Sequence, residues 1–241
     1  MVTDPHVSRW GHARVQRYYR PNMAALTFRE LWRQGGGKLG SQLAIALIGF
    51  PLVAVCKLFH LRFPMGERFP LEIGLEWVDG AFWVQSDPRI RDVIAALREF
   101  GFGFQGAFNV LHAPFHSLVF ALMNPGQGAY ACVYRLNTPI GTVVYADLVT
   151  QFAGGGSLTT THRPDAVAME PPPGKHRLLV PDAPPAQLWE AHQAEVARLG
   201  PQAGGAQPVG TAEELQYHFC RAWREFIEFQ AGRGVFVPVE G

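Results

Sequence analysis

Charged residues are scarce in this chain. Only 17% of its 241 residues are Asp, Glu, Lys or Arg, against roughly 25% in an average soluble protein. The formal net charge is +1, and the arginines are scattered, with no nucleic-acid-binding module beside them. We therefore expect no nucleic-acid partner. Because 48% of the residues are hydrophobic, the chain is long enough to bury a sizeable core.

Cysteine and catalytic motifs are scarce too. The three cysteines lack the spacing of a metal site, and Cys132 and Cys220 could pair only if their Cβ atoms meet, which the sequence leaves open. The chain has no GxSxG elbow and no internal repeat, and Gly154-Gly155-Gly156 lacks the spacing of a dinucleotide loop. We expect no cofactor and no structural metal, and the sequence inclines against an enzyme.

One long apolar run stands out against this low charge. Residues 39–56 carry no charge, and these 18 residues make about 27 Å of helix, slightly less than a ~30 Å hydrocarbon core. Lys57 can extend its ammonium group toward water, which lengthens the apolar segment to residue 61. A phosphate loop is excluded because Leu39 follows Lys38 where Ser or Thr is required, and 38 preceding residues do not suit a secretory signal.

We predict that residues 39–61 form a single transmembrane helix in the cell membrane. A buried core helix of a soluble protein and an interfacial helix are the alternatives. The preceding segment, 1–38, holds seven Arg or Lys against two acidic residues, so its net charge is about +5. This asymmetry predicts a cytoplasmic N-terminus. The expected partner is the lipid bilayer, with a membrane protein as a further candidate.

A short amphipathic helix is expected before the apolar run. Thr27 and Glu30 have the spacing of a capping box, and Phe28, Leu31 and Trp32 follow it. Basic and aromatic residues beside a membrane span are typical of an interfacial anchor. A solvated basic leader is the equally weighted alternative.

Beyond a short linker, residues 70–241 are expected to form one domain. A hairpin is predicted at the start of 70–162 from the alternation of Leu71 to Trp77, the Asp79-Gly80 turn and a return strand from Ala81. A helix and an antiparallel meander follow it. Leu118–Met123 is apolar on both faces, as in a covered central strand. A Pro-rich linker and two helices fill 163–241. The predicted fold class is α+β, with the helices packed on one face of the sheet.

Two weak candidate sites follow from this pattern. Asp147 lies within a long predicted strand, where a buried carboxyl would have a raised pKa and could act as an acid, although a solvent-facing position is more common. His112 and His116 would share one face of a continuous strand as metal ligands. Pro114 interrupts that strand and no third ligand is near, so we favour ordinary hydrogen-bonded histidines.

The sequence therefore predicts a membrane-anchored binding or assembly module without catalytic activity. An enzyme or carrier acting on an apolar or lipid-like ligand is the first alternative, with Asp147 or the His112 and His116 pair as its polar groups. A soluble α+β protein with residues 39–61 as a core helix is the second.

Overall fold

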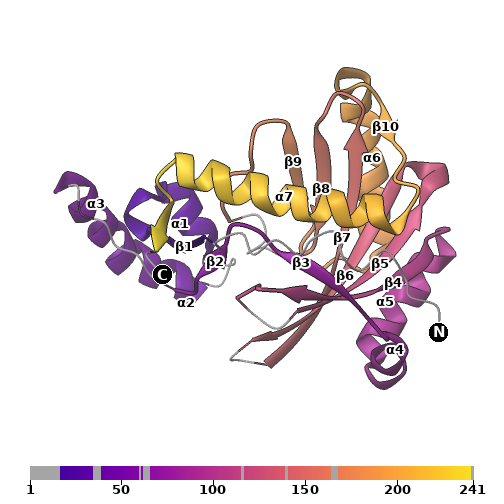
Figure 1. The fold of residues 1–241 in the computed structure, drawn as a ribbon. Coiled ribbons are helices and arrows are strands. Elements are labelled where there is room, and N and C mark those ends of the chain that lie inside the picture. The colour runs from indigo at the N-terminus through magenta and orange to yellow at the C-terminus, as the bar shows by residue number, and fades with distance from the viewer. Residues whose placement is uncertain are drawn as a thin grey trace.

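The computed structural model describes residues 17–34, 39–59, 61, 66–114, 117–138, 141–163 and 168–239. Its main element is an eight-stranded sheet in the order β3-β4-β5-β6-β7-β8-β9, with β10 paired to β7 (Figure 1). The strands are β3 (Gly74–Val78), β4 (Gly103–Leu111), β5 (Ser117–Asn124), β6 (Ala129–Thr138), β7 (Gly141–Phe152), β8 (Ser157–Thr161), β9 (Lys175–Leu179) and β10 (Ala206–Gln207).

The predicted meander is confirmed from β4 to β8, where consecutive strands pair antiparallel. Strand β9 was not predicted. It pairs parallel with β8, so the sheet is mixed, and it follows the Pro-rich stretch at 170–173. The class α+β is correct for this arrangement.

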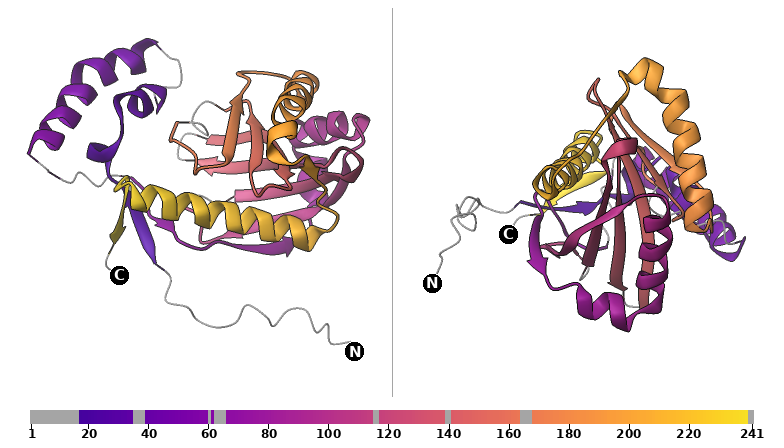
Figure 2. Two further views of the ribbon diagram at one scale, coloured as in Figure 1. Left: turned by 90° about the horizontal axis from the view of Figure 1, so that it is seen from above. Right: turned by 90° about the vertical axis from the view of Figure 1, so that its right-hand side faces the viewer.

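Helices cover both faces of the sheet, and the prediction that they gather on one face is wrong. Helices α5 (Pro88–Glu99) and α6 (Pro185–Ala203) pack on one face with Phe120 and Leu122, whereas α7 (Ala212–Gly232) packs on the other with Val119 and Met123. The right-hand view in Figure 2 shows these two layers on either side of the strands. The cause is β5 itself: all eight of its residues are buried, so each face needs a hydrophobic cover.

The predicted hairpin is also wrong in its second half. Residues after Gly80 form helix α4 (Ala81–Ser86), and β3 pairs with β4 instead. Asp79 Oδ1 accepts a hydrogen bond from the N–H of Ala81 at 2.9 Å, which favours a helix start. A Cβ on Gly80 would lie 2.6 Å from the Cβ of Ala107. Glycine is therefore required here by close packing and not by a hairpin turn.

The helix expected after this point is confirmed as α5. Asp87 caps it by accepting a hydrogen bond from the N–H of Arg89 at 3.2 Å, and Pro88 occupies its first turn. The predicted stop is Gly101, which adopts a φ of +86° that glycine tolerates without strain.

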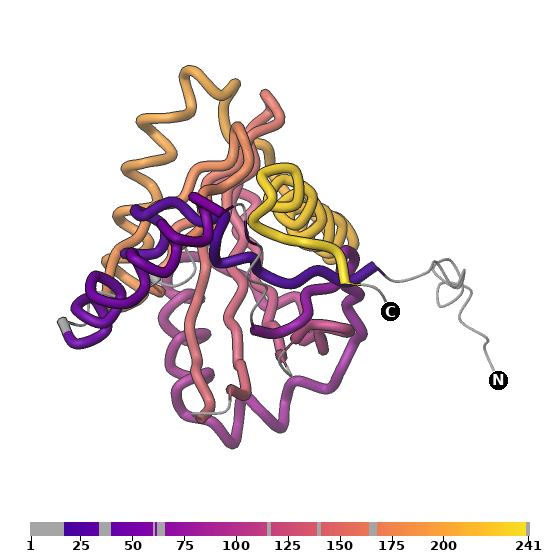
Figure 3. The backbone as a smooth tube through the Cα atoms, turned by 90° about the vertical axis from the view of Figure 1, so that its left-hand side faces the viewer, coloured from indigo at the N-terminus to yellow at the C-terminus, as the bar shows by residue number. Residues whose placement is uncertain are grey.

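A second, smaller unit joins the N-terminal residues to the C-terminal end. Strand β1 (Tyr18–Pro21) pairs with β11 (Phe236–Val239) on one side and β2 (Phe69–Pro70) on the other. Figure 3 shows the first and last described segments lying side by side. Neither β1 nor β11 was predicted, because each is only four residues long.

Glu30 links this unit to the end of α7. It lies in α1 (Phe28–Gln34) and is only 3% exposed. Thr27 donates to it through its N–H and its hydroxyl, each at 2.9 Å, which confirms the capping box. The guanidinium of Arg233 donates to both carboxylate oxygens at 2.8 and 3.0 Å, and the N–H of Glu170 donates at 3.0 Å. Burial raises the pKa of Glu30, but the bonds from Arg233, Glu170 and Thr27 outweigh it and lower the pKa to about 2.

Replacing Glu30 by Gln should destabilise the protein strongly. The substitution leaves Arg233 without its counter-charge, and breaking a buried ion pair in this way costs about 3 kcal/mol. Urea denaturation of the full chain in mild detergent measures the change in unfolding free energy. Glu190→Gln, at an exposed position of α6, is the matched control and should change it by less than about 0.5 kcal/mol. Equal effects of the two substitutions would contradict a linking role for Glu30.

Candidate functional site

The apolar run forms one continuous helix that projects from the end of the body (Figure 2, left). It comprises α2 (Leu39–Ala44), the π-helical turn η2 (Ile45–Gly49) and α3 (Phe50–Leu58). In η2 the N–H of Phe50 donates to the carbonyl of Ile45, five residues back. This wide turn lies directly before Pro51, which has no N–H to donate. The helix therefore continues through its proline.

By length and composition alone, the 19 residues Gly40–Leu58 could cross a membrane. Only 11% of this window is buried in the structure. Val53 and Cys56 are buried, and Leu47 and Ile48 are 75% and 68% exposed. Such exposure does not fit the alternative in which residues 39–61 are a core helix, because a core helix buries most of its side chains.

One narrow stripe of the helix packs against α1 and the body. Phe50 contacts the rings of Phe28 and Trp32 with centroids 5.0 and 6.1 Å apart, and Val53 joins the hydrophobic cluster around Phe236. Lys57 donates to the carbonyl of Leu26 at 2.8 Å, so its ammonium turns back toward the chain before α1. The helix is thereby held on the body along this stripe.

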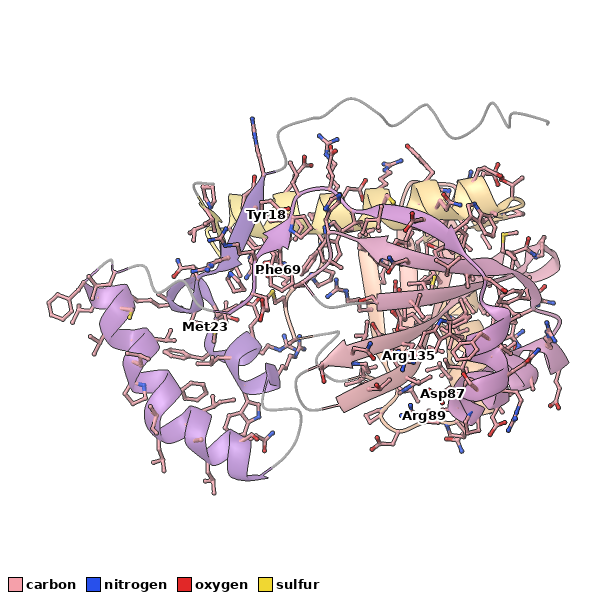
Figure 4. All side chains as sticks on the ribbon, turned by 60° about the horizontal axis from the view of Figure 1, so that its bottom comes forward. Tyr18, Met23, Phe69, Asp87, Arg89 and Arg135 are labelled. Atoms are coloured by element: carbon pink, nitrogen blue, oxygen red, sulfur yellow. The ribbon has the colours of Figure 1, made fainter. Side chains whose placement is uncertain are left out.

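The remaining faces form what we call the anchor surface. Its members are large, apolar and exposed, and all lie in α1, in the long helix or directly after it: Phe28, Trp32, Leu43, Leu47, Ile48, Leu52, Val55, Leu58, Phe59 and Leu61. Figure 4 shows side chains of the long helix extending away from the body. Arg29 and Arg33 are exposed beside it on α1. An apolar patch of this extent marks a contact with a membrane or a protein.

Asp147 lies on the face of the sheet that α7 covers. On β7 it is paired with Cys132 of β6 and Thr161 of β8. The residue is half-buried as a whole, but its Oδ1 is shielded from solvent and has no hydrogen-bond partner among the described residues. Burial raises the pKa of Asp147 to about 6, against the opposing effects of a hydrogen bond from Thr161 and the charges of Arg177 and Arg163.

Aromatic rings and arginines surround this carboxyl. The rings of Tyr134 and Tyr145 stack at 4.5 Å, and the guanidinium of Arg163 lies 4.5 Å from the centroid of Tyr145. Burial, reinforced by the Asp147 charge, raises the pKa of Cys132, Tyr134 and Tyr145. The thiol and both phenols therefore stay protonated near neutral pH, which disfavours a nucleophilic role. Asp147 is the member of the cluster that titrates closest to neutrality.

Only one of the two histidines of the other candidate pair lies among the described residues. His112 is exposed in the turn after β4, with a φ of 67°. His116 lies outside the described residues, so the pairing stays a prediction. Within the described ranges, no group of three or more His, Cys, Asp or Glu side chains is arranged to hold a metal ion.

His192 is a buried polar residue that sequence reasoning did not single out. Its Nε2 lies 3.0 Å from Thr150 Oγ1 and its Nδ1 lies 2.8 Å from Thr160 Oγ1, which ties α6 to β7 and β8. Burial lowers the pKa of His192 to about 4, so the ring is neutral at pH 7. With both ring nitrogens bonded, His192 serves packing. Cys132 and Cys220 are both free thiols, as is Cys56.

The raised pKa of Asp147 should appear in the pH dependence of stability. Its pKa is about 6 in the folded protein and about 3.9 unfolded, so the folded state binds more protons between these values and loses stability as pH rises from 4 to 6. Asp147→Asn removes this titration. We expect the unfolding free energy of the variant relative to wild type to increase by about 2 kcal/mol over that range in urea titrations.

The control for this measurement is Asp92→Asn on α5, at a side chain that is 72% exposed. A flat Asp147→Asn difference between pH 4 and 6 would contradict a buried carboxyl at this position.

The chain has no significant match among protein-family models, curated proteins or solved structures. Its function must therefore be argued from its own surfaces and groups. The feature that departs furthest from an ordinary soluble domain is the anchor surface.

Proposed function

We propose that this protein is attached to a lipid bilayer through the helix of residues 39–58. The observation that carries the proposal is the exposure of a continuous apolar helix, uncharged from residue 39 to 56, over most of its circumference. Burying ten large exposed side chains in lipid would remove them from water at about 25 cal/mol for each Å². Exposed Arg29 and Arg33 on α1 would then meet anionic headgroups.

In a crossing mode, the helix would span the cell membrane once with the basic N-terminal segment in the cytoplasm, which requires the pairing of β1 with β11 and the Glu30–Arg233 ion pair to open. The supporting features are a length of about 28 Å for 19 residues and the excess of basic residues before the helix. The hydrogen bond of Lys57 and the burial of Val53 and Cys56 favour a second mode, in which the helix lies within one leaflet. While these contacts persist, α1 and its charged residues stay beside the helix, and the anchor surface would rest in that leaflet.

We further propose that the body is a binding or assembly module. Two polar groups in its core are engaged in the fold, which supports a role other than catalysis for them. His192 is hydrogen-bonded at both ring nitrogens, and burial keeps Cys132 as a thiol. An enzyme or carrier for an apolar ligand is the alternative, and Asp147 would be its acid, since its pKa of about 6 suits proton transfer.

Charges introduced into the anchor surface should detach the protein from membranes. A charged residue at the centre of a membrane helix costs about 3 kcal/mol, so Leu47→Glu combined with Ile48→Glu should shift the protein from the membrane pellet to the supernatant. Fractionation followed by an alkaline carbonate wash measures this. The control is Phe82→Glu, which charges an equally exposed apolar residue on α4. Wild-type protein that is soluble without the wash would overturn the proposal.

The orientation can be tested by protease protection with a tag at the C-terminus. In sealed inside-out vesicles the crossing mode predicts that the tagged domain is protected until detergent is added, because it lies on the side opposite the cytoplasm. Digestion without detergent would contradict the crossing mode with a cytoplasmic N-terminus. If a carbonate wash also released the protein, the helix would lie in one leaflet.

A further inference from the structure

Two adjoining pockets lie where α5 and α6 begin, on the face of the sheet opposite α7. The first has a volume of about 390 Å³ and is lined by side chains that are mostly polar or charged: Trp83, Ser86, Asp87, Pro88, Arg89 and Arg135. The second has a volume of about 250 Å³, and its walls are mainly Val93, Val144, Ala146, Ala183 and Leu188. Arg89 lines both pockets, so a polar chamber opens beside an apolar one.

The polar chamber has one positive charge in excess. Arg89 donates to both oxygens of Asp87, at 3.0 Å from Nε and 2.8 Å from Nη2, so these two charges cancel. Arg135 is the additional cation, and its side chain is 14% exposed. Its guanidinium lies 4.3 Å from the ring centroid of Trp83, and its Nη1 donates to Asn137.

The Nε of Arg135 is the least satisfied donor of this chamber. It is buried, lies 3.8 Å from Asp87 Oδ2, and has no hydrogen-bond partner within the described part of the chain. Arg135 lines the chamber and its side chain is 14% exposed, so an anionic ligand would approach this cation from the open side. Figure 4 shows Asp87, Arg89 and Arg135 gathered at the start of α5. A carboxylate suits this group because guanidinium donors match its two oxygens.

The apolar chamber contains a second unsatisfied polar atom. His162 lines it, and His162 Nδ1 is buried without a hydrogen-bond partner among the described residues. His162 follows Thr161, which pairs with Asp147 on β7, so it lies beside Ala146. Arg89 donates to the carbonyl of Thr142, four residues earlier on the same strand. At 3.3 Å per residue, Thr142 and Ala146 are about 13 Å apart along β7.

We propose that these chambers form one binding site for a small aromatic or aliphatic carboxylate that carries a hydroxyl or carbonyl group at its opposite end. The carboxylate meets Arg135 and Arg89, the apolar part lies on Val144 and Ala146, and the far polar group bonds to His162. The apolar chamber holds about eight non-hydrogen atoms at ~30 Å³ each.

The probe that matches these dimensions is 4-hydroxyphenylacetate, whose ring, methylene and hydroxyl supply eight non-hydrogen atoms. We expect it to bind the full chain in lipid nanodiscs in ligand-observed NMR titrations, with empty nanodiscs as the blank. Phenylacetate lacks the hydroxyl and 4-hydroxyphenethyl alcohol lacks the carboxylate, so each should bind more weakly than the probe. Loss of the charge-assisted bond should weaken binding about tenfold.

Two variants locate the site. Arg135→Gln should weaken 4-hydroxyphenylacetate about tenfold or more while leaving the alcohol unchanged, because only the carboxylate needs the cation. Val144→Phe should abolish binding of both by filling the apolar chamber. Arg198→Gln, which removes an exposed arginine of α6 far along the chain from the chambers, should leave binding unchanged.

Three results would overturn the proposal. The first is absence of binding by the wild-type chain at a probe concentration of about 10 mM, beyond the range of a weak specific site. The second is equal affinity for inorganic phosphate and the probe, which would reveal a simple anion site. The third is undiminished binding in Arg135→Gln, a variant that keeps a polar side chain beside Trp83 and Asn137. None of these outcomes depends on how the protein is attached to a membrane.

Discussion

The connection between the apolar helix and the body depends on one buried carboxylate. Glu30 belongs to the short helix that packs against the apolar helix, and it bonds to Arg233 at the end of α7 and to Glu170 in the passage before β9. Three segments that are remote in the sequence thus converge on one charge. A charge with so little exposure is tolerable only when its hydrogen bonds are complete, and those bonds hold its pKa near 2.

The same contact explains how an exposed apolar helix can belong to a well-packed protein. Leu31, the neighbour of Glu30, is buried with Val53, Ile227 and Phe236 in one cluster. This cluster covers a single stripe of the long helix and leaves the rest to solvent. The anchor surface is therefore a fixed feature of the folded chain. Figure 1 shows α1, α2 and α3 at one end of the molecule, with α4 and α5 at the other.

Buried polar side chains differ between the two faces of the main sheet. On the face under α7, Asp147 is enclosed with tyrosines and arginines, and no large opening leads to it among the pockets described above. On the face under α5 and α6, His192 is satisfied by two threonines, whereas the side chains of Arg135 and His162 line pockets that open to solvent. Polar side chains that line an open pocket are the positions where a ligand gains specific hydrogen bonds.

The sequence by itself determined the local secondary structure and showed an unusually long apolar segment. Alternation and turn residues are local signals, so the meander, α5 and the capping box of Thr27 and Glu30 were predictable. The unbroken apolar run of β5 correctly implied that both faces of this strand are buried. The prediction that the helices pack on one face of the sheet did not follow from that pattern. Local signals failed where distant packing decides: position 80 is glycine because Ala107 packs against it, and β1 is paired with β11 from the other end of the chain.

Only the tertiary structure decided which polar residues meet. Asp147 was a candidate by its position in a strand, but its arginine neighbours come from segments 16 and 30 residues later in the chain. The chambers beside Arg89 and Arg135 had no signal in the sequence, because their walls come from α5, β6, β7 and the start of α6. Periodicity records how each segment is buried, whereas a site depends on which buried or half-buried segments become neighbours.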